Sequence, residues 1–471
     1  MPLSLRTSVN AACPALNLLG DFVASAPPDL PDGVRRAVRN SIVDVFGCIL
    51  GGARMPVAVA SAKTMRSLGA DHGSARVFGT AHGAPAHTAA MLNAVSGHAL
   101  EFDDWEIPGN THPSVVLFPS LLAVMEEGTP GMDLLMAYVA GFEVIARLGE
   151  ALNFEHYDAG WHSTATLGSI GAAAAVARLH GLSPVQTAHA LSIAISRASG
   201  LTCQFGADTK ALQAGFAAEN GVVSAALAAQ GATGRLEALE HPRGFAALMA
   251  GVPPERIGAA LEKLGNLLAV AEYGILIKPW PSCGYTHRVM CCALDLARMH
   301  PGAGAIHSID LHLPDFHAAI LPFHHPRDRH EALFSLPFVA AMGLAREGLT
   351  LDDLEQERWQ DPDIARLIEC TNIHPFRPSR PLLNYDPLEP DRMRVTLRGG
   401  GQLEAVCALP PGTPEFPVSD KAVVEKFRQN AGHGSDADLE ELMAWPETHC
   451  ARSLFERIGD LTCMAPAVRV A

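Results

Sequence analysis

Apolar residues recur at helical spacing through most of the first 275 residues. In residues 30–50 they fall every three or four positions, which predicts an amphipathic helix that Asp32 can cap. The same spacing predicts further helices over residues 57–67, 85–99, 115–127, 132–152, 160–179, 183–199 and 215–230. Strand patterns are nearly absent here, so we expect this part of the chain to be all-helical.

Local sequence signals add detail to the prediction of two of these helices. Ser183, Pro184 and Gln186 form a capping-box pattern with proline at the first helical position. Residues 160–179 contain a run of four alanines among glycines, and such small side chains let helix backbones approach closely, although glycine weakens the helix itself. We therefore expect tight helix packing around residues 160–179.

The pattern changes after Lys278, where prolines become frequent. Alternating apolar positions predict strands over residues 308–313, 392–397 and 403–409, and helical spacing predicts helices over residues 332–347 and 351–355, the second capped by Thr350 with Asp353. Helical patterns return over residues 423–428, 435–444 and 451–461. The predicted fold is mainly α: a large all-helical domain built from residues 1–275 and 416–471, with a smaller α+β lid domain, residues 276–415, inserted between.

The composition and net charge of the chain limit the classes of partner that it can bind. The chain has 471 residues, 48% of them hydrophobic and 18% charged, with a net charge of −15 and no basic patch. This excludes neither enzymes nor binding proteins, but it argues against nucleic acid or an anionic membrane as partner. Residues 1–25 have no continuous apolar core, and the ten cysteines form no C-x-x-C pair. We expect a cytoplasmic protein with reduced thiols.

A cluster of carboxylates lies in the stretch from residue 98 to residue 120. Glu101, Asp103 and Asp104 are followed by Trp105 and then by His112 in a Thr-His-Pro-Ser step. Like charges this close repel unless helix termini, cations or hydrogen bonds compensate them. A solvated acidic loop is the simpler interpretation, but the apolar segments on both sides favour the rim of a pocket.

Three further places could carry chemistry. His162 precedes the Gly/Ala-rich helix, whose N-terminus suits an anion, and a packed histidine is an equal alternative. Lys210 precedes a predicted helix, which hints at a bound carboxylate, but an exposed lysine paired with Asp208 is the simpler interpretation. Lys278 and Ser282 flank a rigid proline-rich segment, which is favoured as part of a pocket over a plain linker.

The sequence lacks the motifs of zinc sites, nucleotide-binding sites and serine hydrolases. The histidines of residues 307–330 fit no zinc pattern, so we expect surface and turn histidines and no metal. The chain has no G-x-G-x-x-G, no G-x-x-x-x-G-K-[ST] and no G-x-S-x-G motif. Nucleotide-dependent and serine-hydrolase chemistry are therefore not expected.

These clusters, in this order, resemble the MmgE/PrpD family, which includes 2-methylcitrate dehydratases, cis-aconitate decarboxylases and an iminodisuccinate epimerase. The resemblance is carried by NAVSGHALEFDD, THPS, GWHSTATLGSIGAAAAVARLHGLS, TKALQAGFAAENGVVSAALAAQGATG and IKPWPSCGYTH. It spans nearly the whole chain. It implies a homodimer with a helical domain and a lid, acting on a small polycarboxylate without metal or organic cofactor.

The family's site residues carry over motif by motif. The resemblance implies catalytic roles for Glu101, Asp103, Asp104, His112 and His162, and substrate contacts from Lys210, Lys278, Trp105 and Ser282. Three positions depart from the usual pattern: Glu101 replaces Asp, Trp105 replaces the Thr of decarboxylase-like members, and Phe338 replaces a frequent Tyr.

The residue chemistry agrees with this resemblance. Dehydration, decarboxylation and epimerisation all form a carbanion next to a carboxylate, which two lysines can stabilise while histidines move protons. We expect His112 or His162 to act on the substrate, with Glu101 and Asp103 or Asp104 orienting it. A lyase of the dehydratase or decarboxylase kind is favoured. An epimerase or isomerase is the close alternative, a non-catalytic ligand-binding or scaffold protein is a second, and a metal-dependent hydrolase built on the histidines of residues 307–330 is a distant third.

Overall fold

A computed structural model of the chain describes residues 14–25, 29–299, 302–380, 383–432, 436–446 and 451–463. It divides into two compact units, one of residues 1–204, 208–277 and 418–471, the other of residues 205–207 and 278–417. The fold is mainly α with a small mixed sheet, as the sequence predicts. The predicted boundaries after residues 275 and 415, and the role of the second part as a lid, stay predictions.

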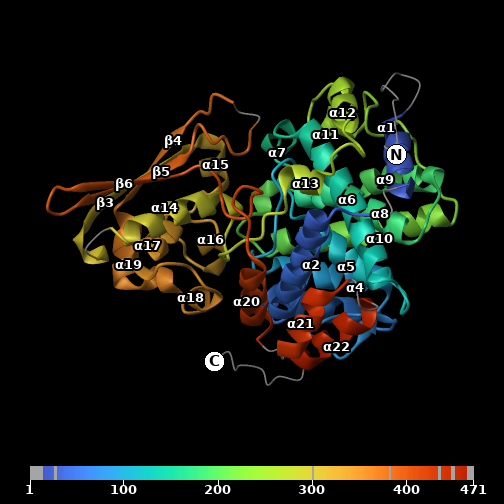
Figure 1. Cartoon of the computed structure of the whole chain (residues 1–471), viewed down its shortest axis with the longest axis horizontal. Coiled ribbons are helices and arrows are strands. Elements are labelled where there is room, and N and C mark those ends of the chain that lie inside the picture. The colour runs from blue at the N-terminus through green and yellow to red at the C-terminus, as the bar shows by residue number, and fades with distance from the viewer. Residues whose placement is uncertain are drawn as a thin grey trace. The chain divides into compact units, whose positions relative to one another are not determined.

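The first unit is almost entirely helical (Figure 1). Its elements are α1 (Ala15–Ser25), α2 (Asp32–Gly52), α3 (Pro56–Ser67), β1 (Ala75–Arg76), β2 (Gly83–Ala84), α4 (Ala86–His98), α5 (Pro113–Val124), α6 (Gly131–Leu152), α7 (Glu155–Asp158), α8 (Ser163–Leu179), α9 (Pro184–Arg197), α10 (Thr209–Ala229), α11 (Phe245–Met249), α12 (Pro254–Leu261), α13 (Ala269–Tyr273), α20 (Asp420–Ala431), α21 (Asp436–Ala444) and α22 (Ala451–Cys463).

Helix α8 lies at the centre of this unit and packs against α5, α6, α9 and α10. Its glycine and alanine content is what allows the close approach. A Cβ on Gly171 would lie 2.3 Å from Ile145 of α6, and one on Gly221 of α10 would lie 2.3 Å from Ala172. The tight packing expected around residues 160–179 is therefore confirmed.

Both ends of the chain contribute to one hydrophobic core in the first unit. The ring of Phe46 in α2 lies 6.0 Å from that of Phe427 in α20 and 5.0 Å from that of Phe455 in α22. Aromatic pairs at these separations are favourable beyond the area that they bury. Packing of this kind fixes the C-terminal helices on α2.

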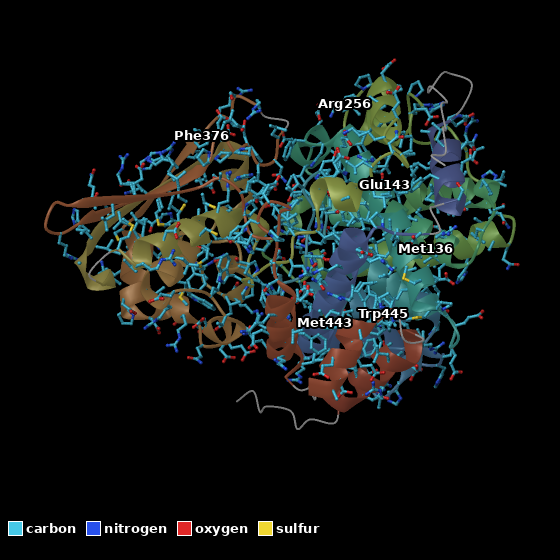
Figure 2. All side chains as sticks on the ribbon, in the orientation of Figure 1. Met136, Glu143, Arg256, Phe376, Met443 and Trp445 are labelled. Carbon is cyan, nitrogen blue, oxygen red and sulfur yellow. The ribbon has the colours of Figure 1, made fainter. Side chains whose placement is uncertain are left out.

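A buried ionic cluster holds the segment that leads out of the first unit. Glu143 of α6, labelled in Figure 2, accepts hydrogen bonds from Arg147 Nε at 2.8 Å and from the backbone N–H of Ala269 at 2.6 Å. Arg147 also donates to Glu272 at 2.8 Å. Because buried charges are stable only when they are paired and hydrogen-bonded, the cluster ties α13 firmly to α6.

The second unit contains α14 (His287–Ala297), β3 (Ile306–Pro314), α15 (Asp315–Ile320), α16 (Arg329–Ala332), α17 (Leu336–Arg346), α18 (Leu351–Glu355), α19 (Pro362–Glu369), β4 (Thr371–Phe376), β5 (Asp391–Leu397) and β6 (Gln402–Cys407). The strands form one sheet in the order β4-β3-β5-β6, in which β3 is parallel to β4 and antiparallel to β5. Helix α14 packs on β5 and β6, and α17 packs against α14 and α19.

Most predicted helices and strands are confirmed, but one cap, several bounds and a number of missed elements need correction. Ser183 with Gln186, and Thr350 with Asp353, form the predicted capping boxes. Asp32 does not cap α2, because Pro31 takes that position and Asp32 lies in the first turn, where its charge still suits the helix dipole.

The other corrections concern element bounds. Helix α10 begins at Thr209, six residues before the predicted start, and the helix predicted over residues 332–347 begins only at Leu336, as α17, with Ser335 as its N-cap residue. Strand β4 was not predicted, and neither were helices α1, α7, α11 to α16 and α19 or the short strands β1 and β2. Ser435, the first residue of the helix predicted over residues 435–444, lies outside the described residues. Cys450, one of the ten cysteines, also lies outside them.

No single helix among the described residues is both long and apolar enough to cross a membrane, and one bent pair, α2 with α3, passes on length and composition only.

Candidate active site

The acidic loop follows directly on α4 and is buried. Glu101, Asp103 and Asp104 are 4%, 0% and 0% exposed, so the solvated-loop interpretation is wrong. The chain leaves α4 through a left-handed residue, Glu101 (φ 54°), a conformation uncommon for a residue with a side chain. Two backbone hydrogen bonds between Trp105 and Leu276, of 3.1 and 2.8 Å, fix the far end of the loop.

Asp103 lies between two histidines. His98 Nδ1 is 2.9 Å from its carboxylate, and His112 Nδ1 is 3.2 Å from it and 2.9 Å from the backbone oxygen of Asp104. Burial opposes ionisation here, but the contacts with His98 and His112 outweigh it and hold the pKa of Asp103 well below its usual range. An ionised Asp103 therefore orients both rings, with hydrogen on each Nδ1.

Lys210 connects this pair to Glu101. It lies in the first turn of α10 and is 5% exposed, so an exposed lysine paired with Asp208 is the wrong interpretation. Its ammonium group donates to His98 Nε2 at 2.9 Å and to the Glu101 carboxylate. His98 Nε2 accepts this bond only as a neutral ring, so Asp103, His98, Lys210 and Glu101 form one continuous chain of hydrogen bonds.

His162 is the N-cap residue of α8, as the sequence predicts, and is 1% exposed. Its Nδ1 lies 2.5 Å from Gln213 Oε1, while Gln213 Nε2 donates to the backbone oxygen of Leu201 at 3.1 Å. That second bond makes Oε1 the acceptor, which places the hydrogen of His162 on Nδ1 and a lone pair on Nε2.

Burial, together with the charge of Lys210, holds the pKa of His162 well below its usual value. The ring is therefore neutral at pH 7. Its plane is nearly parallel to that of His98, with the ring centres 6.1 Å apart, so His162 belongs to the same cluster as Asp103 and Lys210. A neutral imidazole with a lone pair at Nε2 can act as a general base.

Asp104 has a different role from the one expected. Its carboxylate contacts Ser114 Oγ at 2.5 Å, and Ser114 in turn contacts Tyr138 at 2.6 Å. Burial and the charge of Asp44 raise the pKa of Asp104 well above its usual value, although the Ser114 hydrogen bond opposes them. The side chain therefore favours the neutral acid and contacts Ser114, and it is the Asp104 backbone oxygen that helps to orient His112.

Glu106 shapes the loop that carries His112. Its carboxylate accepts hydrogen bonds from the Gly109 N–H at 2.9 Å, the Thr111 N–H at 3.1 Å and the Thr111 hydroxyl at 2.7 Å. Burial raises the pKa of Glu106 to about 7, even though these bonds favour the charged form. Glu106 thus closes the turn from which His112 reaches Asp103.

The remaining predicted residues are also buried. Trp105 is 5% exposed in the first unit, whereas Lys278 and Ser282, each 0% exposed, belong to the second. Ser282 Oγ lies 2.8 Å from Thr286 Oγ1. Phe338, which stands where many family members carry Tyr, contacts the ring of Trp359 edge-on at 6.0 Å. Contacts of Lys278, Ser282 and Trp105 with a substrate stay predictions.

Among the described residues, His98, Asp103 and His112 could hold a metal ion by proximity, because one ligand atom from each lies within 4.8 Å of the others. The donor set fits poorly. Both Nδ1 atoms point their hydrogens at oxygen acceptors, and His98 Nε2 accepts from an ammonium group. The hydrogen-bond chain accounts for the proximity, and absence of metal from the working enzyme stays a prediction that elemental analysis can test.

The structure adds three residues that the sequence analysis did not assign: His98, Gln213 and Glu106. His98 stands inside the SGHALEFDD stretch but ends a helix, where a packed histidine is the ordinary expectation. Gln213 looks like any helical glutamine. Glu106 had one signal, the Pro-Gly-Asn break that follows it, which calls for an acceptor of loop N–H groups.

Comparison with known proteins identifies the family of the chain. The model of the MmgE/PrpD N-terminal domain matches residues 17–257, and that of the MmgE/PrpD C-terminal domain matches residues 280–444. The chain is similar to the cis-aconitate decarboxylase of Homo sapiens, with 28% identity over 80% of this chain and 77% of that protein. It is equally similar to a cis-aconitate decarboxylase-like protein of Aspergillus oryzae, with 28% identity over 88% and 89%. The cis-aconitate decarboxylase of Aspergillus terreus is 26% identical over 87% and 88%.

Proposed function

We propose that this chain, which belongs to the MmgE/PrpD family, is a lyase that acts on a small polycarboxylate such as cis-aconitate or 2-methylcitrate. The observation that carries the proposal is the buried chain of hydrogen bonds from Asp103 through His98 and Lys210 to Glu101, with His112 and His162 against it. Two of the named relatives, those of Homo sapiens and Aspergillus terreus, are cis-aconitate decarboxylases, which supports decarboxylation over dehydration.

The difficult step is the formation of a carbanion beside a carboxylate. In a decarboxylation the bond to the departing carboxylate breaks, its electron pair stays on carbon, and a proton is added after CO₂ leaves. In a dehydration a base removes the proton on the carbon α to a carboxylate, and the hydroxyl group on the neighbouring carbon leaves as water with a proton from an acid. Lys210 supplies positive charge for the developing anion, in a dry site where such charge acts strongly.

Two histidines are available for the proton transfers. His162 is neutral with its lone pair on Nε2, which suits a base. The Nδ1 of His112 is held by the Asp104 backbone oxygen and by Asp103, so its Nε2, 4.0 Å from Glu101, is the nitrogen that can exchange a proton. We assign His162 as the base and His112, when it carries a second proton on Nε2, as the proton donor.

The test is turnover in D₂O of cis-aconitate, citrate, 2-methylcitrate and iminodisuccinate by the purified protein, with products followed by NMR. A lyase gives loss of CO₂ or water. Deuterium at the carbon α to a carboxylate with unchanged composition would instead indicate the epimerase alternative. Binding in a thermal-shift assay without any turnover would indicate a non-catalytic ligand-binding protein and would end the proposal.

Variants test the assigned residues. His162→Ala and Lys278→Ala should each lower kcat by at least about 100-fold, a barrier change of about 2.7 kcal/mol. The matched control is His180→Ala, at the exposed C-terminal end of the same helix α8, which should behave like the parent. Rates within about tenfold of the parent for both site variants, a change below about 1.4 kcal/mol, would remove these residues from catalysis.

A further inference from the structure

Helix α20, from the C-terminal part of the chain, is docked on α2 without room for adjustment. A Cβ on Gly51 would lie 2.7 Å from the backbone oxygen of Asn430, and one on Gly47 would lie 3.0 Å from the ring of Phe427. Contacts under 3.0 Å exclude any side chain at position 51. Close backbone packing therefore fixes the path of α20 over α2, and with it the backbone positions from which the side chains of α20 extend.

One of these side chains, Lys426, reaches the acidic loop. It is 6% exposed and makes three contacts. Its ammonium group donates to the backbone oxygen of Phe102 at 2.6 Å, pairs with Asp44 of α2 at 2.7 Å, and lies 4.0 Å from the centre of the Phe102 ring. A buried ammonium group is stable only with partners of this kind.

The position of Phe102 gives these contacts their meaning. It lies between Glu101, which has the left-handed backbone, and Asp103, which orients His98 and His112. The carbonyl that Lys426 holds belongs to the peptide unit that joins Phe102 to Asp103. Because that unit is planar, fixing its oxygen also fixes the direction in which the chain presents Asp103.

Lys426 also compensates the charge of Asp44, which is 0% exposed. Asp44 in turn helps to raise the pKa of Asp104, second only to burial. The lysine thus acts on both neighbouring acids, on Asp103 through the backbone and on Asp104 through Asp44.

We propose that Lys426 is a positioning residue for the reaction, anchoring the Phe102 carbonyl so that Asp103 holds His98 and His112 in their working orientation. This inference rests on the proposed function. It assigns to α20 a role in catalysis as well as in the core.

The experiment separates positioning from simple charge compensation with three variants. Lys426→Met removes the donor to Phe102 and the positive charge beside Asp44. The double variant Lys426→Met/Asp44→Asn also removes the negative charge of Asp44. Lys421→Met, on an exposed turn of the same helix, is the matched control. For each, the urea midpoint, kcat and KM are measured with the substrate that the parent turns over.

We expect Lys426→Met to be less stable and the double variant to regain most of the lost stability. Both should keep kcat at least tenfold below the parent with KM within threefold, while Lys421→Met matches the parent. Recovery of kcat to within twofold of the parent in the double variant would overturn the proposal, because Lys426 would then serve only to neutralise Asp44. So would a parent-like kcat in Lys426→Met.

A second measurement needs no substrate. In protein labelled with ¹⁵N-histidine, the Nδ1–H signals of His98 and His112 report the bonds to Asp103 and Asp104. They should shift or broaden in the double variant and stay unchanged in Lys421→Met. If the parent turned over none of the four substrates, the proposed function would fail, and these signals alone would decide the role of Lys426: unchanged signals in the double variant would refute it.

Discussion

Glu106 offers a prediction whose size follows from its surroundings. The carboxyl is 0% exposed, and burial raises its pKa from 4.5 to about 7 against the hydrogen bonds from Gly109 and Thr111. Glu106→Gln replaces it with an amide that resembles the neutral acid and cannot titrate. The substitution therefore isolates the free energy that the folded protein loses when this one carboxyl becomes charged.

The sign follows from proton binding. Between pH 4.5 and about 7 the folded state holds a proton on Glu106 that the unfolded state has released, so stability falls as the pH rises. The contribution is fully present below the unfolded pKa and is lost as the pH passes the folded pKa. From pH 5 to pH 8 the loss amounts to about 2.5 kcal/mol, at about 1.4 kcal/mol per unit of pKa shift.

The amide brings a second cost that does not depend on pH. One carboxylate oxygen of Glu106 accepts only from the Gly109 N–H, at 2.9 Å, and an amide NH₂ there would face another donor. Leaving such a buried group unsatisfied costs about 1–3 kcal/mol at every pH. The informative quantity is therefore how the difference between parent and variant changes with pH, not its value at one pH.

The assay is urea unfolding of parent and Glu106→Gln at pH 5, 6, 7 and 8 and constant ionic strength. Glu126→Gln, at an exposed position, is the control and should run parallel to the parent. The stability of the parent minus that of Glu106→Gln should fall by about 2.5 kcal/mol across this range. Parallel curves, within about 0.5 kcal/mol, would show that Glu106 does not titrate here and would refute the reasoning from burial.

Two further predictions concern single hydrogen-bond partners. Gln213→Leu should lower kcat by about 10–100-fold with little change in KM, because His162 loses the acceptor that fixes its tautomer, and steady-state kinetics test this. Arg288→Met should destabilise the protein by about 3–5 kcal/mol, because it leaves Asp391 buried without its partner. As burial already raises the pKa of Asp391 to about 6, that loss should be larger at pH 8 than at pH 5, which urea unfolding at the two pH values can check.

The sequence predicted elements well where the deciding interactions are local. The capping box at Ser183 needs only residues within one turn. The start of α10 was misplaced because Lys210 in a first turn is unfavourable for the helix alone, and its compensating partner, Glu101, lies 109 positions away in the chain. Strand β4 was missed for a related reason: Pro375 argues against a strand, but an edge strand tolerates proline, and β4 is at the edge of its sheet.

The same difference between local and long-range interactions decides which parts of the site the sequence could predict. The cluster of Glu101 and Asp103 with His112 was visible in one stretch of sequence. The sequence did not predict which side chains form hydrogen bonds with one another. His98 joins Asp103 to Lys210, and no spacing rule connects residues 98 and 210. The sequence left open whether Asp103 or Asp104 orients the histidine, because adjacent residues in an irregular loop point in directions that only the folded backbone decides.

The charge of the cluster constrains how it can hold a polycarboxylate. Glu101 and an ionised Asp103 face the single ammonium group of Lys210, while the environment of Asp104 favours its neutral form. A substrate with several carboxylates would add negative charge where the balance is already negative, so at least one more cation must take part in binding. Lys278, carried over from the family, is the candidate. If Lys278 has that role, Lys278→Ala should raise KM more for a tricarboxylate than for a dicarboxylate. Equal effects on both KM values would mean that the compensating positive charge comes from another group. Protonation of His112 is the alternative source of that charge.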